Sequence, residues 1–114
     1  MENDCLFCKI ISGEIPAKKV FEDDNMIIIN DINPIAPIHY LLIVKNHYAS
    51  LFEQSIEQSH ILGECLNKLS IMKSSLGLDN GYRLIINQGK DAGQTVNHLH
   101  VHILSGKELG WNKL

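Results

Sequence analysis

Apolar residues along the chain recur at two different spacings, one typical of helices and one typical of strands. The pattern predicts a short amphipathic helix over residues 4–11, capped by Asp4 and ended by Gly13. A capping box at Ser55 and Gln58 begins a longer run, in which apolar residues return every three or four positions up to Gly77. The sequence therefore predicts one short and one long helix.

Five shorter segments have the composition of β-strands, with turn-forming residues between them. The turn Asp23-Asp24-Asn25 joins the first two into a hairpin, and a nearly continuous apolar run predicts a central position for the third. The expected strands cover residues 19–22, 26–30, 39–45, 82–87 and 98–104. Because the strands are grouped, we expect an α+β fold, a five-stranded antiparallel sheet with both helices on one face.

Length and composition describe one globular unit. With 114 residues, 45% of them hydrophobic, the chain is expected to form a single domain over residues 1–114. The net charge of −3 gives no support for binding to nucleic acid or to an anionic membrane surface. The first four residues do not resemble a signal peptide, no apolar run approaches about 18 residues, and three cysteines do not suggest a disulfide framework. We therefore expect a cytoplasmic protein.

Three histidines at alternate positions form the most informative stretch of the chain. His98, His100 and His102 alternate with apolar residues, so a strand would turn all three imidazoles to one face, about 7 Å apart. Such a face suits a metal ion or an anion such as phosphate, and the solvated face of an edge strand is the remaining alternative. A catalytic metal held by all three histidines is one form of the metal hypothesis.

A phosphate at this face would meet groups suited to its chemistry. A neutral imidazole near its usual pKa of about 6.5 is a good nucleophile, and neighbouring imidazoles can donate hydrogen bonds to phosphate oxygens. The loop before the histidines adds main-chain N–H groups at Gly89 and Gly93 and the hydroxyl of Thr95. The residues are therefore compatible with covalent catalysis at phosphorus.

The histidine run and several further blocks resemble the histidine triad (HIT) family. His98-x-His100-x-His102, followed by two apolar residues, is similar to the family signature. The other blocks resemble, in order and nearly end to end, those of its Hint-like branch, the purine nucleoside phosphoramidases. They are Cys5-Leu6-Phe7-Cys8-Lys9-Ile10-Ile11, Glu14-Ile15-Pro16-Ala17, Phe21-Glu22-Asp23-Asp24, Asp31-Ile32, Ala36-Pro37-x-His39, Gly81-Tyr82-Arg83 and Gly93-Gln94-Thr95-Val96.

The resemblance implies roles for the histidines and an assembly. His100 matches the nucleophile that forms a nucleotidyl-histidine intermediate at the α-phosphorus of an AMP-type ligand, which water then resolves. His102 matches the ring that contacts the phosphate oxygens, His98 the residue that helps to orient His100, and His39 completes the cluster. The resemblance also implies a homodimer in which two sheets join into one of ten strands.

Residues of the nucleotide site are likewise assigned by resemblance. Asp31 matches the carboxylate that takes the ribose hydroxyls, although it could equally end a strand and cap a turn. Thr95 stands where serine is common, Asn97 replaces a more usual aromatic residue, and Trp111 matches the branch near the C-terminus. The remaining expected contacts are Ile32 beside the base, Asn87, Gly93, Gln94 and Thr95 at the phosphate, and Leu6, Phe7, Ile10 and Ile15 along an apolar base slot.

The Cys5-x-x-Cys8 pair has the spacing of half a tetrahedral zinc site. His47 and His98 are the candidates for the other two ligands, and the resemblance supports them because bacterial members that keep both cysteines use this combination. The zinc would be structural, and His98 would then serve the metal and not protonate the leaving group. The alternative is a pair of reduced cysteines on an amphipathic helix.

We therefore expect a hydrolase or transferase that cleaves P–N bonds of adenosine 5′-phosphoramidate type through His100 and releases AMP. It would need no catalytic cofactor, and its partners would be a purine nucleotide and a second copy of itself. One alternative is a dinucleoside polyphosphate hydrolase. Another is a catalytically idle nucleotide-binding or scaffold protein held together by zinc.

Overall fold

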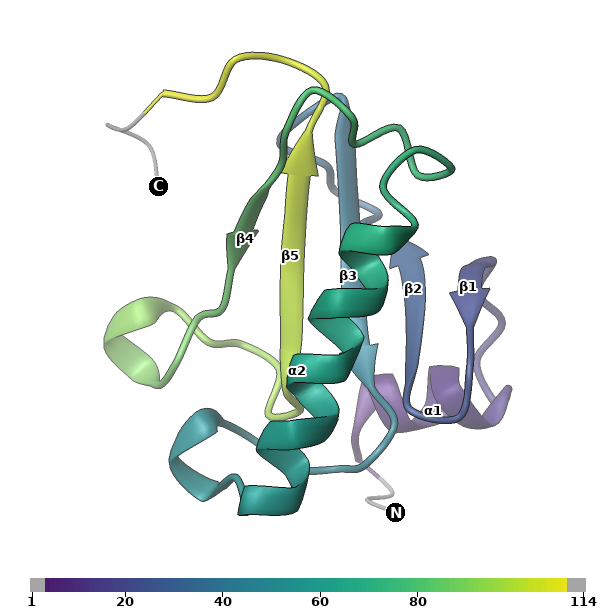
Figure 1. The fold of residues 1–114 in the computed structure, drawn as a ribbon. Coiled ribbons are helices and arrows are strands. Elements are labelled where there is room, and N and C mark those ends of the chain that lie inside the picture. Colours follow the sequence, from purple (N-terminus) through teal and green to yellow (C-terminus); the bar gives the residue numbers. More distant parts are fainter. Residues whose placement is uncertain (1–3, 111–114) are drawn as a thin grey trace.

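The computed structural model describes residues 4–110, which form one sheet with helices on both sides (Figure 1). The elements are α1 (Leu6–Ser12), β1 (Lys19–Glu22), β2 (Met26–Asn30), β3 (Ile38–Val44), the 3-10 helix η1 (Leu51–Glu53), α2 (Ile56–Ile71), β4 (Arg83–Ile85), the 3-10 helix η2 (Lys90–Ala92) and β5 (His100–Ser105). The expected α+β fold with a five-stranded antiparallel sheet is confirmed. The first two strands have the predicted bounds.

Strand β3 lies at the centre of the sheet, as its apolar composition predicted. The strand order is β1-β2-β3-β5-β4, and every neighbouring pair is antiparallel. The register places His100 opposite Ile43 and His102 opposite Leu41. Residues of the last strand therefore lie beside the central strand of the sheet, in which residues 41–44 are buried.

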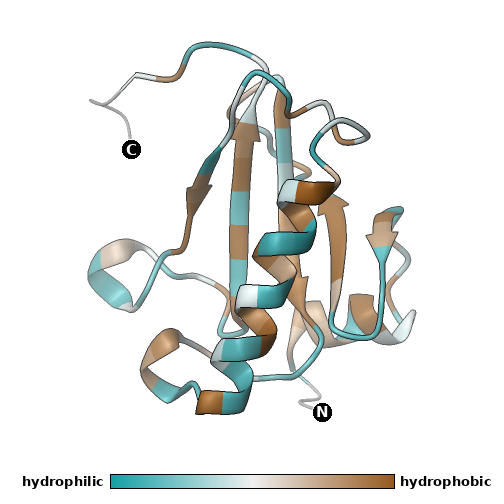
Figure 2. Cartoon of the chain, in the orientation of Figure 1, coloured by the Kyte–Doolittle hydropathy of each residue, from teal (hydrophilic) through white to brown (hydrophobic). Residues whose placement is uncertain are grey.

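The two helices cover opposite faces of the sheet, so the expectation that both lie on one face is wrong. Met26 and Ile28 of β2 pack in the cluster that contains the buried side of α2, whereas Ile27 and Ile29 pack in the cluster that contains α1. Strand β2 is hydrophobic from Met26 to Ile29, whereas β5 begins with alternating polar and hydrophobic residues (Figure 2). A strand that is apolar on both faces needs cover on both, and α1 supplies it on the second face.

Helix α2 begins with the predicted capping box, in which Ser55 accepts from the main chain of Gln58 and the Gln58 side chain accepts from Ser55. Its regular part ends at Ile71, and one irregular turn continues towards Gly77. This glycine has a φ of 76°, and hydrogen bonds from its own N–H to Ser74 and from Leu78 N–H to Lys73 close the turn. That pair of bonds is the Schellman motif, so Gly77 ends the helical segment as predicted.

Other boundaries differ from the sequence expectation, by one residue at each end of β3, which covers residues 38–44, and by more in the following cases. Cys5, not Asp4, caps α1, because its sulfur accepts from the main-chain N–H of Cys8. Strand β4 is shorter than predicted and pairs on one side only, with β5. Strand β5 begins at His100 and not at His98, because the main-chain N–H of Leu99 donates to Tyr48 outside the sheet.

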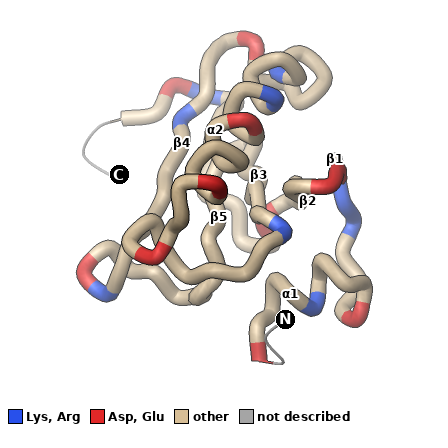
Figure 3. The backbone as a smooth tube through the Cα atoms, turned by 60° about the horizontal axis from the view of Figure 1, so that its bottom comes forward, with Lys and Arg blue, Asp and Glu red and all other residues tan. Residues whose placement is uncertain are grey.

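Charged residues of both signs are interspersed along the described chain (Figure 3). Two ion pairs join separate elements: Lys68 of α2 contacts Asp23 at 2.7 Å, and Lys45 contacts Glu22 of β1 at 2.8 Å. Among residues 4–110, no helix is long and apolar enough to span a membrane. The first three residues and Trp111, on which sequence expectations also rested, lie outside the described range.

Candidate active site and metal centre

Two of the three alternating histidines project from β5 on the face that α1 covers. The rings of His100 and His102 lie 5.3 Å apart between centroids, at an interplanar angle of 68°. His98 precedes the strand, and its side chain is fully buried. The expectation that one strand carries all three imidazoles is therefore wrong for His98, which precedes β5 and enters a separate cluster, although its ring stays on the α1 side, where Phe7 contacts both His98 and His100.

The His100 ring is oriented by one main-chain hydrogen bond. Its Nδ1 lies 2.7 Å from the carbonyl oxygen of His98. A carbonyl only accepts, so Nδ1 of His100 carries the proton and donates it. In the neutral ring, Nε2 then keeps its lone pair, which is the requirement for a nucleophilic imidazole.

His102 is oriented by a chain of hydrogen bonds that starts at the main chain of Ile35. The N–H of Ile35 donates to Nδ1 of His39 at 3.2 Å, so a neutral His39 carries its proton on Nε2. That proton faces Nδ1 of His102 at 2.9 Å and Oδ2 of Asp31 at 3.3 Å. Because Nδ1 of His102 accepts, Nε2 of His102 carries a proton and can donate to an anion.

The surroundings of His102 also favour its neutral form. Burial lowers its pKa below the usual value, and the neighbouring His100 and His39 lower it further, whereas Asp31 raises it. The net direction is downward. A neutral His102 is the form that the hydrogen-bond chain requires, so geometry and electrostatics agree.

A second cluster brings together Cys5, Cys8, His47 and His98, whose ligand atoms all lie within 4.8 Å of one another. Nδ1 of His98 lies 3.4 Å from the Cys5 sulfur, 3.6 Å from the Cys8 sulfur and 3.1 Å from Nδ1 of His47. The Cys8 sulfur lies 3.2 Å from the same nitrogen of His47. Residues far apart in the sequence thus present four metal-ligating atoms to one point.

The far nitrogen of His98 decides how this ring faces the cluster. Its Nε2 lies 2.6 Å from the carbonyl oxygen of Val44, so Nε2 carries the proton. Nδ1 therefore points a lone pair at the two sulfurs, and burial lowers the pKa of His98, which keeps the ring neutral. The ring of His98 serves this cluster while those of His100 and His102 do not, so one metal held by all three histidines does not fit.

The expected base-side residues differ widely in exposure. Ile32 is 91% exposed and Leu6 is 46% exposed, whereas Phe7 is 5% exposed. The Phe7 ring packs edge-on against His100 at 5.0 Å and His98 at 6.0 Å between centroids. Ile10 is buried with Phe7 in the α1 cluster, and Ile15 packs against that cluster.

The expected phosphate-side residues lie in or next to the loop before the histidines. Asn87 is partly buried and Thr95 is exposed. Gln94 ties the loop together, since its side-chain oxygen accepts from Gly89 N–H and its side-chain nitrogen donates to Ala49 at 2.6 Å. Gly93 has a φ of 78° and donates its own N–H to Lys90. Gln94 and Gly93 thus shape the loop, and their contact with a phosphate stays a prediction.

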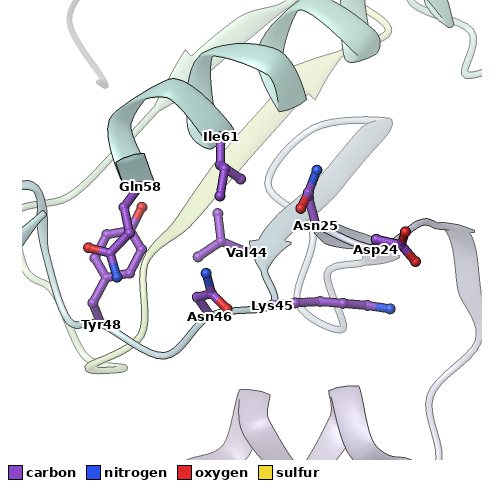
Figure 4. A pocket seen from close by; sticks show the side chains of 8 residues that line it. All are labelled: Asp24, Asn25, Val44, Lys45, Asn46, Tyr48, Gln58 and Ile61. Atoms are coloured by element: carbon purple, nitrogen blue, oxygen red, sulfur yellow. The ribbon is translucent and has the colours of Figure 1, made fainter. Parts of the chain in front are cut away.

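Two cavities differ sharply in size. One of about 380 Å³ is lined by Leu6, Thr95 and both Cys5 and His47 of the second cluster, among others. The other, of about 20 Å³, lies under the first turns of α2 and is lined by Val44, Tyr48, Ile61 and neighbours (Figure 4). The smaller one has room for a single water molecule and is not a nucleotide site.

Sequence reasoning missed the main-chain groups that orient the rings, namely the N–H of Ile35 and the carbonyls of Val44 and His98. Every residue carries such groups, so side-chain composition holds no signal for them. It also missed the contact between Phe7 and His100. His60, which the sequence placed outside the site, is exposed on α2.

The sheet topology and the histidine pair on its fifth strand define a histidine triad protein. Residues 12–109 match the family model of the HIT domain. The chain belongs to the HIT family. The protein HitA of Neisseria gonorrhoeae is 45% identical over 102 residues, which cover 90% of this chain and 95% of HitA.

Solved structures agree with this assignment. A HIT family hydrolase from Clostridium thermocellum is 43% identical, with a TM-score of 0.92 over 100% of both chains. A histidine triad nucleotide-binding protein from Candida albicans is 35% identical, with a TM-score of 0.79 over 95% of this chain and 82% of that one. A Zn-bound histidine triad family protein from Mycobacterium smegmatis is 34% identical, with a TM-score of 0.77 over 91% and 76%.

Proposed function

We propose that this protein cleaves the P–N bond of adenosine 5′-phosphoramidates and releases AMP, with His100 as the nucleophile. The observation that carries the proposal is the 2.7 Å hydrogen bond from Nδ1 of His100 to the His98 carbonyl, which leaves Nε2 with its lone pair. The similarity to HIT family hydrolases supports a hydrolytic reaction. The choice of a phosphoramidate as the substrate rests on the sequence blocks that resemble the Hint-like branch.

The neighbouring groups fit the charge that develops at phosphorus. Nε2–H of His102, fixed by the chain through His39, is placed to donate to a non-bridging oxygen of the phosphate. A donor that is already oriented stabilises the transition state without reorganising during the reaction. Asp31, which follows β2 and lies 3.3 Å from His39, is proposed to take the ribose hydroxyls, and the exposed Ile32 beside it to contact the base.

The reaction proceeds in two displacements. Nε2 of His100 forms a bond to the α-phosphorus as the P–N bond breaks, and the departing amine takes up one proton. Water then attacks the nucleotidyl-histidine, gives up one proton and releases AMP with the free imidazole, so protons balance over the cycle. His98 is not the donor to the leaving amine, because its Nε2–H is held by Val44 and its Nδ1 faces the cysteines.

We also propose that Cys5, Cys8, His47 and His98 hold a structural zinc ion. With Zn–S bonds of about 2.3 Å and Zn–N bonds of about 2.0–2.1 Å, the edges of a tetrahedral site measure about 3.3–3.8 Å. The four separations given above run from 3.1 to 3.6 Å, close to those edges. Two sulfurs and two imidazoles complete a closed site with no position for substrate, so the metal would supply folding energy rather than chemistry.

The proposed assembly is a homodimer that joins two sheets along β4. Among the described elements β1 and β4 are both edge strands; we place the junction at β4, whose outer edge is available to a second copy and whose Leu84 is 39% exposed. A sedimentation mass near 12.8 kDa, that of one chain, would refute the dimer. The proposed location is the cytoplasm, because three cysteines in a chain of this composition do not suggest a disulfide framework.

The decisive experiment compares the native protein with His100→Ala on a labelled adenosine phosphoramidate. We expect the substitution to reduce turnover by several orders of magnitude and to leave AMP affinity within about tenfold, because only the covalent nucleophile is lost. His60→Ala, which removes an exposed imidazole on α2, should turn over at the native rate.

Other results would point to the alternatives. Equal rates for native protein and His100→Ala would refute the nucleophile. Binding of AMP without any turnover by the native protein would indicate a nucleotide-binding scaffold. Faster cleavage of a dinucleoside polyphosphate than of the phosphoramidate would reassign the substrate.

A further inference from the structure

His98 contacts both the proposed nucleophile and the other residues of the proposed metal cluster. The main-chain carbonyl of His98 accepts the proton of His100 Nδ1, while the side chain of the same residue enters the Cys5, Cys8 and His47 cluster. These two contacts lie on either side of one α-carbon. Whatever fixes the His98 ring also limits where its carbonyl points.

The sheet itself does little to hold that carbonyl. Pairing between β3 and β5 begins at Ile43 opposite His100, so His98 lies outside the ladder of hydrogen bonds. Its position depends on the bond from Leu99 N–H to Tyr48 and on the two nitrogens of its own ring, one bound to Val44 and one facing the sulfurs. The cluster therefore supplies one of the few constraints on this segment.

A second contact reaches the same ring through α1. Phe7 lies between the two cysteines in the sequence, and its ring packs edge-on against His100 at an interplanar angle of 79°. Helix α1 has seven residues, too few to be stable by itself, and its first turn carries the two sulfurs that face His47 and His98. Anchoring the cysteines thus also anchors Phe7 against the nucleophile.

We infer that metal bound by Cys5, Cys8, His47 and His98 sets the orientation of the His100 ring, through the His98 carbonyl on one side and the Phe7 ring on the other. The inference rests on the proposed metal site and gives that site a role in positioning the nucleophile of the proposed reaction. His98 and Phe7 are positioning residues here, because each acts on His100 and not on the phosphate. The metal contacts no substrate in this arrangement.

The direct test is a metal exchange followed by NMR of the histidine rings. Replacing zinc by the larger cadmium ion lengthens the bonds to sulfur and should shift the cluster without unfolding the protein. We expect the ring ¹⁵N and ¹H signals of His100 to move several-fold more than those of His60, which is exposed on α2. Unchanged His100 signals, with cobalt absorption bands proving that the cysteines bind metal, would overturn the inference.

Substitutions separate the two routes. Cys5→Ser keeps an oxygen that can cap α1 but removes a metal ligand, so His100 should lose its single Nδ1–H form and exchange between tautomers. Phe7→Leu keeps apolar bulk and should keep the cobalt spectrum, while the contribution of the Phe7 ring current to the His100 chemical shifts disappears. Cys65→Ala, which removes a buried thiol on the α2 side of the sheet, is the matched control and should leave the His100 signals unchanged.

The outcomes distinguish this inference from the proposed reaction. If the zinc-loaded protein does not cleave phosphoramidates but His100 still responds to the metal, the proposed reaction fails and the coupling stands. If cleavage occurs, but His100 keeps one tautomer in Cys5→Ser and its signals do not move when cadmium replaces zinc, the coupling fails and the reaction stands. If no metal binds at all, both the metal site and the coupling are refuted.

Discussion

Two clusters of metal-ligating side chains lie at different positions along the β5 segment, and we propose a cation in only one of them. Cys5, Cys8, His47 and His98 form the first, and Asp31, His39 and His102 form the second; in each, the ligand atoms lie within 4.8 Å of one another. Both contain a histidine of the triad. The distances between ligand atoms alone do not distinguish the two clusters as metal sites.

The difference lies in the main-chain partner on the far side of each imidazole. In the first cluster the Val44 carbonyl holds the proton of His98 on Nε2, so Nδ1 turns a lone pair inward. In the second the Ile35 N–H occupies Nδ1 of His39, so the inward nitrogen carries a proton. A cation in the second cluster would meet that N–H. The main-chain group bound to the outer nitrogen thus decides the role of the ring: a carbonyl there leaves the inner nitrogen free to bind a metal, and an N–H there makes the inner nitrogen a donor.

Ligand chemistry separates the clusters further. Two thiolates and two imidazoles match the preferences of zinc, whereas one carboxylate beside two imidazoles can also hold a proton between them. The carboxylate of Asp31 lies 3.3 Å from His39 and 3.9 Å from His102, so it faces the hydrogen-bond chain itself. The second cluster is thus a device for orienting His102.

The largest predicted effect is the loss of stability when the metal is removed from the first cluster. Removing zinc from the native protein should lower its stability by about 3 kcal/mol or more, which for a domain of this size lowers the melting temperature by more than about 10 °C. Calorimetry with and without chelator measures the difference. Cys8→Ser should abolish the chelator effect, because a ligand is missing in both conditions.

Two control variants sharpen the contrast between the clusters. Cys65→Ala has a thiol removed from the α2 side of the core and should keep the full chelator effect. Asp31→Asn should also keep it, and both this variant and the native protein are expected to bind one zinc per chain. A second equivalent of tightly bound zinc in the native protein that disappears in Asp31→Asn would contradict the distinction drawn from Ile35.

The next largest predicted effect is a loss of kcat when the hydrogen-bond chain to His102 is interrupted. His39→Ala removes the group that donates to His102, so the His102 proton is free to move between its two nitrogens. Loss of a preorganised donor costs about 10²–10³ in kcat, and loss of its orientation alone should cost less, about tenfold. Single-turnover rates measure this effect, and zinc content should not change. A native rate in His39→Ala, with His102 still protonated on Nε2 by ¹⁵N NMR, would show that the chain is not needed.

The sequence predicted the residues of the site better than it predicted the arrangement of helices around the sheet. Alternating and continuous apolar runs predicted β1 and β2 at their observed bounds and β3 at the centre. The same pattern did not reveal that α1 and α2 lie on opposite faces, because Ile27, Ile28 and Ile29 show that both faces are apolar but not which helix covers which. That choice is made by packing between distant segments.

The chemistry of the side chains was visible in the sequence, and their directions were not. Cys5, Cys8, His47 and His98 do come together, as their residue types suggested. His98, however, was expected to lie on the same strand as His100, whereas it precedes β5 and its ring enters the cluster of Cys5, Cys8 and His47. The direction of an imidazole depends on hydrogen bonds to main-chain atoms, which no side-chain pattern encodes.

The smallest predicted effect concerns the charge of Asp31. Its carboxylate raises the pKa of His102, against burial and the two neighbouring imidazoles that lower it. Asp31→Asn should therefore lower this pKa further. As the pH falls through the pKa, Nδ1 of His102 takes up a proton and no longer accepts from His39, so kcat declines on the acidic side.

With the pKa lower in Asp31→Asn, the acidic decline of kcat should begin at a lower pH than in the native protein, while kcat at pH 7 changes by less than tenfold. The same direction should appear in an NMR titration of His102, which does not depend on turnover. Asp24→Asn makes the same change of charge at an exposed turn and should leave both curves unmoved. A His102 titration that moves to higher pH in Asp31→Asn would mean that the carboxylate acts on this ring by breaking or moving hydrogen bonds, and not through its charge. In that case the second cluster would orient His102 by geometry alone.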